Sequence, residues 1–189
     1  MTDLEAHLPR GRVLLPADVH VHFDGACQPP GGGGVATYGF TIEGGGLSHE
    51  EKGLAVRPWS PRATNNVAEY TAAVRALEWL LAQGYTGPVR VMGDSQLVIR
   101  QINGEYKVLA PHLVEYHAQL RRLADSFERI QFVWIRREAN SRADELSKQA
   151  LEVEWDRAGR DRPETPVTPE PEPENLPDDS QGPKAPRGP

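Results

Sequence analysis

Asp94 is the clearest of four acidic side chains whose positions would allow a carboxylate to do chemistry. It follows the short apolar run Val89–Gly93 and precedes a helix-forming segment, which places a carboxylate at the carboxyl end of a buried strand. Open α/β sheets bind their ligands at that edge. A lone Asp there is also common as a helix N-cap, so this residue alone leaves a structural and a functional interpretation open.

Three further carboxylates occupy comparable positions. Asp24 lies near the end of an alternating strand at 18–27, Glu69 in the first turn of a helix that starts at Thr64, and Asp144 in the first turn of a helix that starts at Ser141. An acidic residue in a first turn also complements the helix dipole, so each has a structural explanation of its own. Together they indicate one acidic edge of a sheet.

The elements that must position these acids follow the order β-β-β-α-β-α-α-β-α. The expected strands are 18–27, 35–42, 47–56, 89–94 and 130–134, with helices near 64–83, 95–102, from 111 and from 141. The first three strands form an antiparallel meander, and helical crossovers lead to the last two. The fold class is therefore α/β, with a mixed five-stranded sheet of three meander strands and two parallel strands flanked by helices.

Composition limits the class of protein. The chain has 189 residues, of which 38% are hydrophobic and 25% charged, and no apolar run approaches the roughly 20 residues of a membrane helix. With no signal-peptide layout, we expect a cytoplasmic protein with no membrane association. The single cysteine, Cys27, excludes an internal disulfide and a multi-cysteine zinc site. The net charge of −6 argues against a strongly basic nucleic-acid binder but allows local basic patches.

The two ends differ from the centre. Residues 1–16 show no long periodicity and are expected to be a loose leader, and residues 17–155 form the folded domain. From 156 to 189 there are eight acidic and five basic residues, together with about half of the 17 prolines. Such an acidic, Pro/Glu-rich segment cannot bury apolar surface, so a disordered tail is expected. A solubilising linker is favoured over a docking motif, and the sequence names no partner for the tail.

Four short motifs carry a family resemblance, which covers about residues 17–153. They are Phe23-Asp24-Gly25-Ala26, Thr64-Asn65-Asn66-Val67-Ala68-Glu69, Gly93-Asp94-Ser95-Gln96 and Ala143-Asp144-Glu145-Leu146. In type and order they resemble the signatures of type 1 ribonuclease H. The resemblance implies the ribonuclease H-like fold and an endoribonuclease that hydrolyses the RNA strand of RNA/DNA hybrids, leaving 5′-phosphate and 3′-hydroxyl ends.

The resemblance also implies a catalytic and metal-binding set made of Asp24, Glu69, Asp94 and Asp144. Two Mg²⁺ ions about 4 Å apart, with Mn²⁺ as an alternative, would activate the water and stabilise the leaving oxygen. Asp24 would bridge both ions, Glu69 and Asp94 would bind the ion on the leaving-group side, and Asp144 the ion that activates water.

Substrate contacts follow from the same resemblance, because reading RNA against DNA requires groups that sense 2′-hydroxyls across the shallow minor groove. Asn65, Asn66 and Gln96 match the groove-reading amides, and Arg62 and Thr64 match positions that hold a phosphate of the DNA strand. The remaining expected contacts are Gly25, Ala26 and Ser95.

The sequence departs from many family members in the loop before the last helix. Residues 136–140 contain no histidine, so the chain resembles a shorter subfamily that lacks one. Arg136 or Arg137 is a candidate auxiliary residue that neutralises phosphate charge, against plain backbone contact as the alternative. Pro29-Pro30 replaces a common Asn-Pro-Gly, and a basic handle helix is missing.

Three rival interpretations stay open. A noncatalytic nucleic-acid-binding module could keep the fold, but it would be expected to lose a carboxylate, and all four are present. Another metal nuclease on the same fold would not be expected to begin a helix with Thr-Asn-Asn-x-x-Glu. The chain could also be the nuclease part of a larger system with the tail as a tether. A monomer is the expected oligomeric state.

Overall fold

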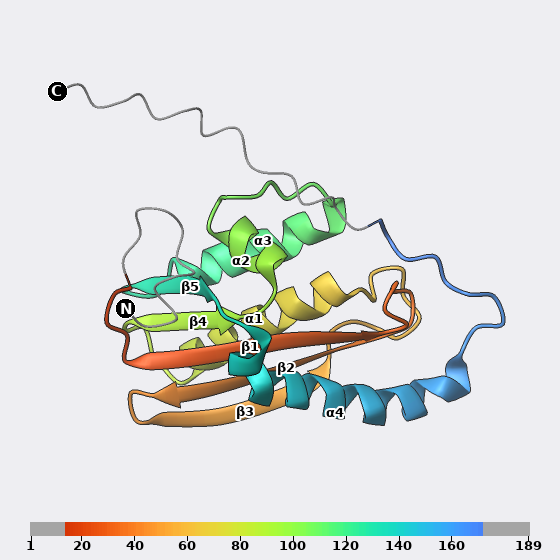
Figure 1. The fold of residues 1–189 in the computed structure, drawn as a ribbon, viewed down its shortest axis with the longest axis horizontal. Helices are drawn as coiled ribbons and strands as arrows, with labels where there is room; N and C mark the ends of the chain where they lie inside the picture. Colours follow the sequence, from red (N-terminus) through yellow and green to blue (C-terminus); the bar gives the residue numbers. More distant parts are fainter. Residues whose placement is uncertain (1–13, 172–189) are drawn as a thin grey trace, which may run out of the picture.

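The computed structural model describes residues 14–171. Its elements follow the expected order, apart from two added 3₁₀ helices. They are β1 (Val19–Gln28), β2 (Val35–Gly44), β3 (Leu47–Leu54), α1 (Asn65–Ala82), β4 (Val89–Gly93), α2 (Gln96–Ile102), α3 (Pro111–Ala124), β5 (Ile130–Trp134), η2 (Arg137–Asn140), α4 (Ser141–Ala158) and η3 (Gly159–Asp161) (Figure 1).

The sheet has the strand order β3-β2-β1-β4-β5, with β1 at its centre. β1 pairs antiparallel with β2, and β2 antiparallel with β3, which is the expected meander. β1 pairs parallel with β4, and β4 parallel with β5. The α/β fold class with a mixed five-stranded sheet is therefore confirmed. Because β1 and β4 are parallel neighbours, the residues at their carboxyl ends meet at the same edge.

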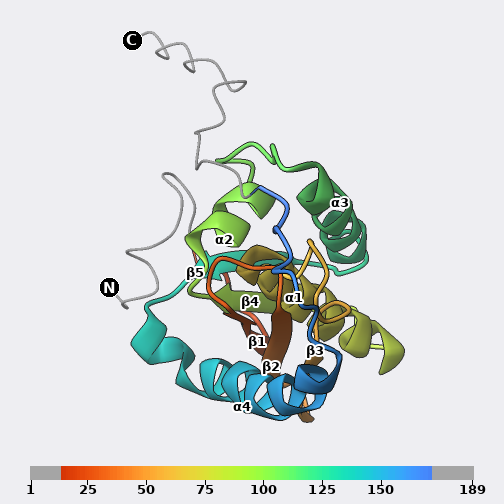
Figure 2. The same ribbon diagram turned by 90° about the vertical axis from the view of Figure 1, so that its right-hand side faces the viewer.

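Helices cover both faces of the sheet (Figure 2). α1 packs on β1 and β2 and also contacts α2 and α3, and α4 covers β1, β2 and β3 on the other face. The main core lies under α1, where Phe23, Phe40, Tyr70 and Leu77 are fully buried. Among the described residues, none of the helices combines the length and apolarity needed to cross a bilayer.

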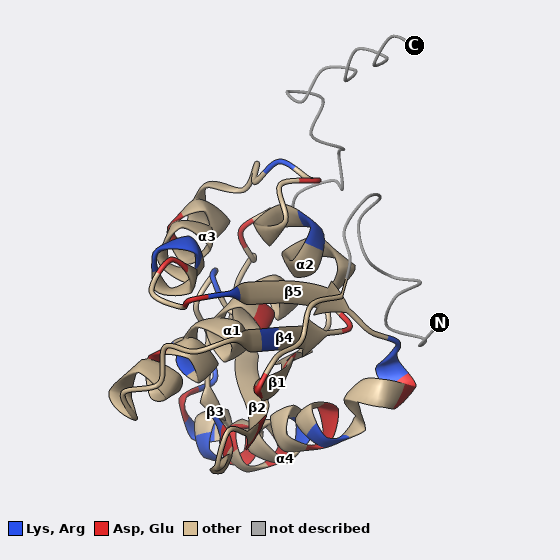
Figure 3. Cartoon of the chain, turned by 90° about the vertical axis from the view of Figure 1, so that its left-hand side faces the viewer, with Lys and Arg blue, Asp and Glu red and all other residues tan. Residues whose placement is uncertain are grey.

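The close approach of α4 depends on Gly39 in β2. A Cβ atom at this position would lie 2.7 Å from the Leu146 Cβ and 2.8 Å from the Ala143 carbonyl oxygen. Basic and acidic residues both occur along α4, as Figure 3 shows, and some of them pair at helical spacing, for example Arg142 with Glu145 and Arg157 with Glu154. Such exposed pairs contribute little to stability.

The ends of the domain differ from the expected boundaries. α4 continues to Ala158 and η3 to Asp161, so the boundary predicted at residue 155 falls inside the last helix. Residues 162–171 then run back along the domain, and residues 172–189 of the expected tail lie outside the described part. At the other end, the Leu15 amide donates to Gln131 Oε1 (2.9 Å). Residues 1–13 of the expected leader lie outside the part of the chain that the structure describes.

Candidate active site

Three of the four expected carboxylates form one cluster. Asp24, Glu69 and Asp94 each present an oxygen, and these three oxygens lie within 4.8 Å of one another. Asp24 comes from β1, Glu69 from the second turn of α1 rather than the expected first turn, and Asp94 directly follows β4. Asp24 and Glu69 are each only 4% exposed. Separate elements thus bring acids 45 and 25 residues apart in the sequence to one sheet edge.

Burial dominates the electrostatics of this cluster. Burial raises the pKa of Asp24 to about 7, the hydrogen bond from Ser147 opposes the rise, and the charges of Asp94 and Asp144 add to it. The pKa of Glu69 lies well above its usual range, again through burial first and then through the charges of Asp24 and Asp94. The protein alone therefore provides too little positive charge to keep all three acids ionised.

The donor set fits a hard divalent cation. All three groups offer carboxylate oxygens, the ligand type that Mg²⁺ and Mn²⁺ take in proteins. Glu69 Oε2 is buried without a hydrogen-bond partner among the described residues. An unsatisfied buried carboxylate oxygen is costly, and a cation at the cluster would satisfy it and offset the repulsion.

Asp144 lies beside this cluster and is held in ion pairs. Its Oδ1 is 2.5 Å from Arg137 Nη2, and its Oδ2 is 2.5 Å from Lys148 Nζ, one helical turn further along α4. Partial burial would raise its pKa, but the hydrogen bonds from Lys148 and Arg137 outweigh it and hold the pKa below the usual value. The charge of Asp144 still reaches Asp24. Asp144 is thus ionised and close to the cluster, and both of its carboxylate oxygens are paired with basic side chains.

The two candidate auxiliary arginines differ in their contacts with the acids. Arg137, rather than Arg136, forms the ion pair with Asp144, and its pKa is raised by this hydrogen bond and by the charges of Asp94 and Asp24. Its side chain is 66% exposed, so it can leave the pair without a large desolvation change. Arg136 is an exposed residue that precedes η2.

The expected substrate residues surround the cluster at the starts of two helices. Thr64 caps α1 by accepting from the Val67 amide (3.3 Å), and Ser95 caps α2 by accepting from the Val98 amide (3.5 Å). Asn65 and Gln96 are exposed at the first helical positions. The other members of this set are Gly25 and Ala26 after Asp24, Arg62 before α1, and the half-buried Asn66.

Two residues that hold the acids in place were not predicted from the sequence. Asn140 is 1% exposed, and its Nδ2 donates to Asp94 Oδ1 (3.0 Å) and to the Phe23 carbonyl (2.9 Å). Ser147 is fully buried, and its hydroxyl donates to Asp24 Oδ2. Ser147 stands three residues after Asp144, on the same side of α4, so helical spacing from that acid was the available signal.

We expect Ser147→Ala to weaken divalent-metal binding about tenfold, because its hydroxyl orients the Asp24 carboxylate through a hydrogen bond. Titration calorimetry with Mn²⁺ measures the affinity directly. Ser141→Ala is a matched control, since Ser141 is exposed at the start of the same helix. Equal Mn²⁺ affinities for wild type and Ser147→Ala would show that the hydroxyl does not position Asp24.

The fold and the acidic edge define a class: a ribonuclease H-like domain with a carboxylate cluster suited to divalent metal. A family profile described as "Reverse transcriptase-like" matches residues 49–150. A relative from Aromatoleum aromaticum named "Ribonuclease H" is 32% identical over 152 residues, which cover 71% of this chain and 91% of the relative. The chain belongs to the type 1 ribonuclease H family.

Solved structures agree with this assignment. The N-terminal RNase H domain of Rv2228c from Mycobacterium tuberculosis superposes with a TM-score of 0.64 at 32% identity, covering 77% of this chain and 99% of that one. LC11-RNase H1, solved in complex with an RNA/DNA hybrid, gives 0.63 at 35% identity and covers 72% of this chain and 98% of that one. Against the full-length mycobacterial relatives, however, the match spans only 27% of their length.

Proposed function

We propose that the chain is an endoribonuclease that hydrolyses the RNA strand of RNA/DNA hybrids with two divalent metal ions, Mg²⁺ in the first place. The observation that carries the proposal is the cluster of Asp24, Glu69 and Asp94 at the carboxyl edge of β1 and β4. Within it, the buried Glu69 Oε2 has no hydrogen-bond partner among the described residues. The solved LC11-RNase H1 complex, a relative at 35% identity with an RNA/DNA hybrid bound, supports the substrate class.

The proposed chemistry divides between the metal and the chain. Bound divalent cations would supply activation of the attacking water and charge stabilisation at the leaving 3′ oxygen, which gives 5′-phosphate and 3′-hydroxyl products. Asp24, Glu69 and Asp94 would hold the metal, and Asp144 would join them once its ion pairs with Arg137 and Lys148 open. Asn140 and Ser147 keep Asp94 and Asp24 in the orientation that the reaction needs.

Arg137 takes part as an auxiliary group in the absence of a loop histidine. It is the cation nearest to the acids among the two candidates, and release from Asp144 would let its guanidinium neutralise charge on the phosphate. Exposed amides on Asn65 and Gln96, with Asn66 beside them, would read the minor groove. Arg62 and Thr64 would hold a phosphate of the DNA strand.

The test is cleavage of an end-labelled RNA/DNA hybrid, with RNA/RNA, DNA/DNA and single strands beside it, in Mg²⁺, Mn²⁺ and EDTA. We expect metal-dependent cutting of the hybrid's RNA strand alone, lost in Asp94→Asn, and a lower turnover for Arg137→Ala than for Arg136→Ala. Binding of the hybrid without any cleavage would favour a noncatalytic module on the same fold. Monomeric state and cytoplasmic location stay predictions from the sequence.

A further inference from the structure

Residues 162–171, called the C-terminal strap below, return from the end of α4 to the loop that precedes α1 (Figures 1 and 2). The Glu170 amide donates to the Pro61 carbonyl (2.8 Å). Val167 and Pro169 lie directly on the glycine-rich loop, where a Cβ atom on Gly32 would come 2.9 Å from the Pro169 Cβ. The strap therefore ends on the side of the domain where α1 begins.

The Glu170 carboxylate sits between two basic groups. Its Oε2 is 2.8 Å from His112 Nδ1, at the start of α3, and its Oε1 is 3.5 Å from Arg62 Nε. The Glu170 side chain is 35% exposed and that of Arg62 45%, whereas that of His112 is 1% exposed. Arg62 has a second, looser acidic neighbour in Glu115, at 3.6 Å.

His112 indicates that this pocket is made for an anion. Among the described residues, neither of its buried ring nitrogens has a hydrogen bond of good alignment, even though Nδ1 lies so close to Glu170. A buried imidazole normally satisfies at least one nitrogen. An oxyanion that enters with more orientational freedom than a tethered side chain would satisfy it.

Arg62 and the neighbouring Thr64 are also the residues expected to hold a phosphate of the DNA strand. Thr64 caps α1, and Glu69 lies five residues further along that helix, about 7.5 Å along its axis at 1.5 Å per residue. The carboxylate of Glu170 thus occupies the position expected for an anion bound to Arg62, at the start of the helix that carries Glu69. A bound phosphate and Glu170 could not both be paired with Arg62 and His112.

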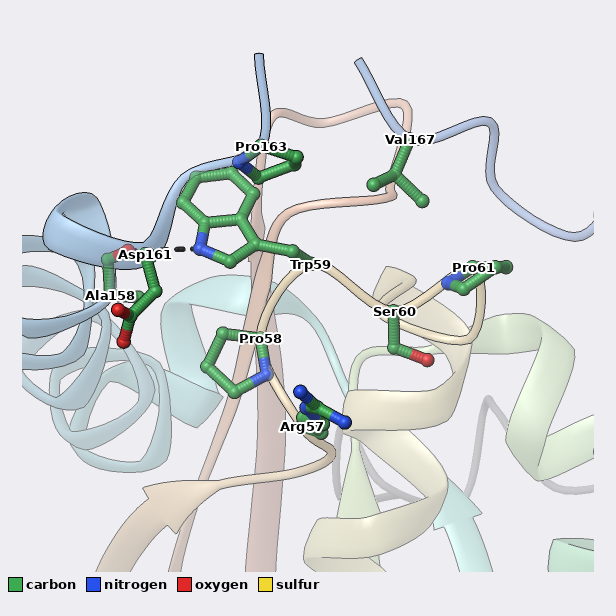
Figure 4. A pocket seen from close by; sticks show the side chains of 9 residues that line it. All are labelled: Arg57, Pro58, Trp59, Ser60, Pro61, Ala158, Asp161, Pro163 and Val167. Carbon is green, nitrogen blue, oxygen red and sulfur yellow. Dashed lines mark hydrogen bonds between the residues drawn. The ribbon is translucent and has the colours of Figure 1, made fainter. Parts of the chain in front are cut away.

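The strap has an anchor at its base and a cavity beside its middle part (Figure 4). At its base, Trp59 Nε1 donates to the Ala158 carbonyl (2.9 Å), and the Arg162 guanidinium lies over the Trp59 ring at 5.8 Å. Beyond this anchor a cavity of about 670 Å³ separates the loop at 57–61 from Pro163 and Val167. Next to this cavity the strap buries little apolar surface, so its release is opposed mainly by the contacts of Val167, Pro169 and Glu170 at its far end.

We propose that the C-terminal strap is an autoinhibitory segment, in which Glu170 occupies a phosphate-binding pocket of Arg62 and His112 and must leave before a nucleic-acid backbone can bind. This inference rests on the proposed function, because it assumes a hybrid as the competing ligand. Trp59 keeps the base of the strap attached while its far end is displaced. The strap then lowers affinity for every ligand whose backbone must fill this pocket.

The test compares wild type with Glu170→Gln, which removes the charge and keeps the shape, and with Glu164→Gln. Glu164 is exposed on the same strap, so its substitution changes the net charge equally. Fluorescence anisotropy with a labelled RNA/DNA hybrid in EDTA measures binding without cleavage. We expect Glu170→Gln to bind about three- to tenfold more tightly and Glu164→Gln to stay within about twofold.

Cleavage assays in Mg²⁺ supply the second measurement, with a lower KM and unchanged kcat expected for Glu170→Gln. Equal hybrid affinities of wild type and Glu170→Gln in EDTA would overturn autoinhibition by the strap. An equal gain in affinity for Glu164→Gln would also overturn it, because that gain would reflect the net charge alone. If Glu170→Gln tightens hybrid binding but no variant cleaves the hybrid, the proposed function is wrong and the autoinhibitory role of the strap is supported.

Discussion

Replacing Asp24 by asparagine is expected to lower hybrid cleavage by at least about a thousandfold while making the metal-free protein more stable. The loss of activity follows from the position of Asp24 in the cluster, where one of its oxygens lies within 4.8 Å of an oxygen of Glu69 and of an oxygen of Asp94. In the proposed function Asp24 holds divalent metal, and removing such a ligand takes away several kcal/mol of transition-state stabilisation. Asparagine can still accept the hydrogen bond from Ser147, so the local packing is retained.

The gain in stability follows from the raised pKa of Asp24, which is about 7 in the folded protein because of burial and the neighbouring acids. Between the ordinary pKa of 3.8 and about 7, the folded state binds a proton that the unfolded state has released. The contribution of Asp24 to stability is therefore fully present below pH 3.8 and is lost as the pH rises through about 7. The uncharged amide of the Asp24→Asn variant avoids this loss, worth on the order of 4 kcal/mol at about pH 8.

Thermal unfolding in EDTA at about pH 5 and about pH 8 measures this effect. Asp24→Asn should unfold at a higher temperature than wild type, with the larger difference at the higher pH, and added Mg²⁺ should stabilise the wild type alone. Asp18→Asn is the matched control, since Asp18 is exposed just before the same strand. A lower unfolding temperature for Asp24→Asn at the higher pH would mean that the three acids are compensated by the protein itself.

The sheet was predictable because its strands are marked by local alternation of apolar and polar residues. Val19, Val21 and Phe23 alternate with polar residues along β1, and all three are fully buried, as a half-buried strand requires. The end of α4 was not predictable in this way. The acidic and basic residues from Asp156 onward read as a tail, yet the contacts of Trp155 and Ala158 with Trp59, almost a hundred residues earlier, continue the helix. Tertiary contacts outweigh composition there.

The acids at the site were predictable from short motifs, and the groups that surround them were not. Asp24, Glu69 and Asp94 stand in patterned elements, so the parallel pairing of β1 and β4 places Asp24 beside Asp94, and the packing of α1 on β1 adds Glu69. The hydrogen bond from Asn140 to Asp94 and that from Ser147 to Asp24 join residues 46 and 123 positions apart. Such pairs depend on how α4 crosses the sheet, which periodicity alone does not determine.

Gly25 supplies the second large expected effect. Gly25→Ala should destabilise the protein by about 3 kcal/mol, because β1 and α1 meet at this glycine without space for a side chain. A Cβ atom would overlap with the Glu69 amide nitrogen and lie 2.7 Å from the Ala68 carbonyl carbon. Both are backbone atoms that cannot rotate away, so the strand and the helix must separate. Urea unfolding, with the midpoint shifted at constant slope, measures the loss.

The same shift would separate Asp24 from Glu69, and a displacement of about 1 Å at a catalytic site can cost a hundredfold in rate. Gly31→Ala is the control, because a Cβ there meets nothing within 4 Å, and its φ is not among the positive values. We expect its stability to change by less than about 0.5 kcal/mol. Gly25 was also predicted to contact the substrate. A Gly25→Ala protein of normal stability that has lost hybrid binding would assign this glycine to the substrate rather than to the packing of α1 on β1.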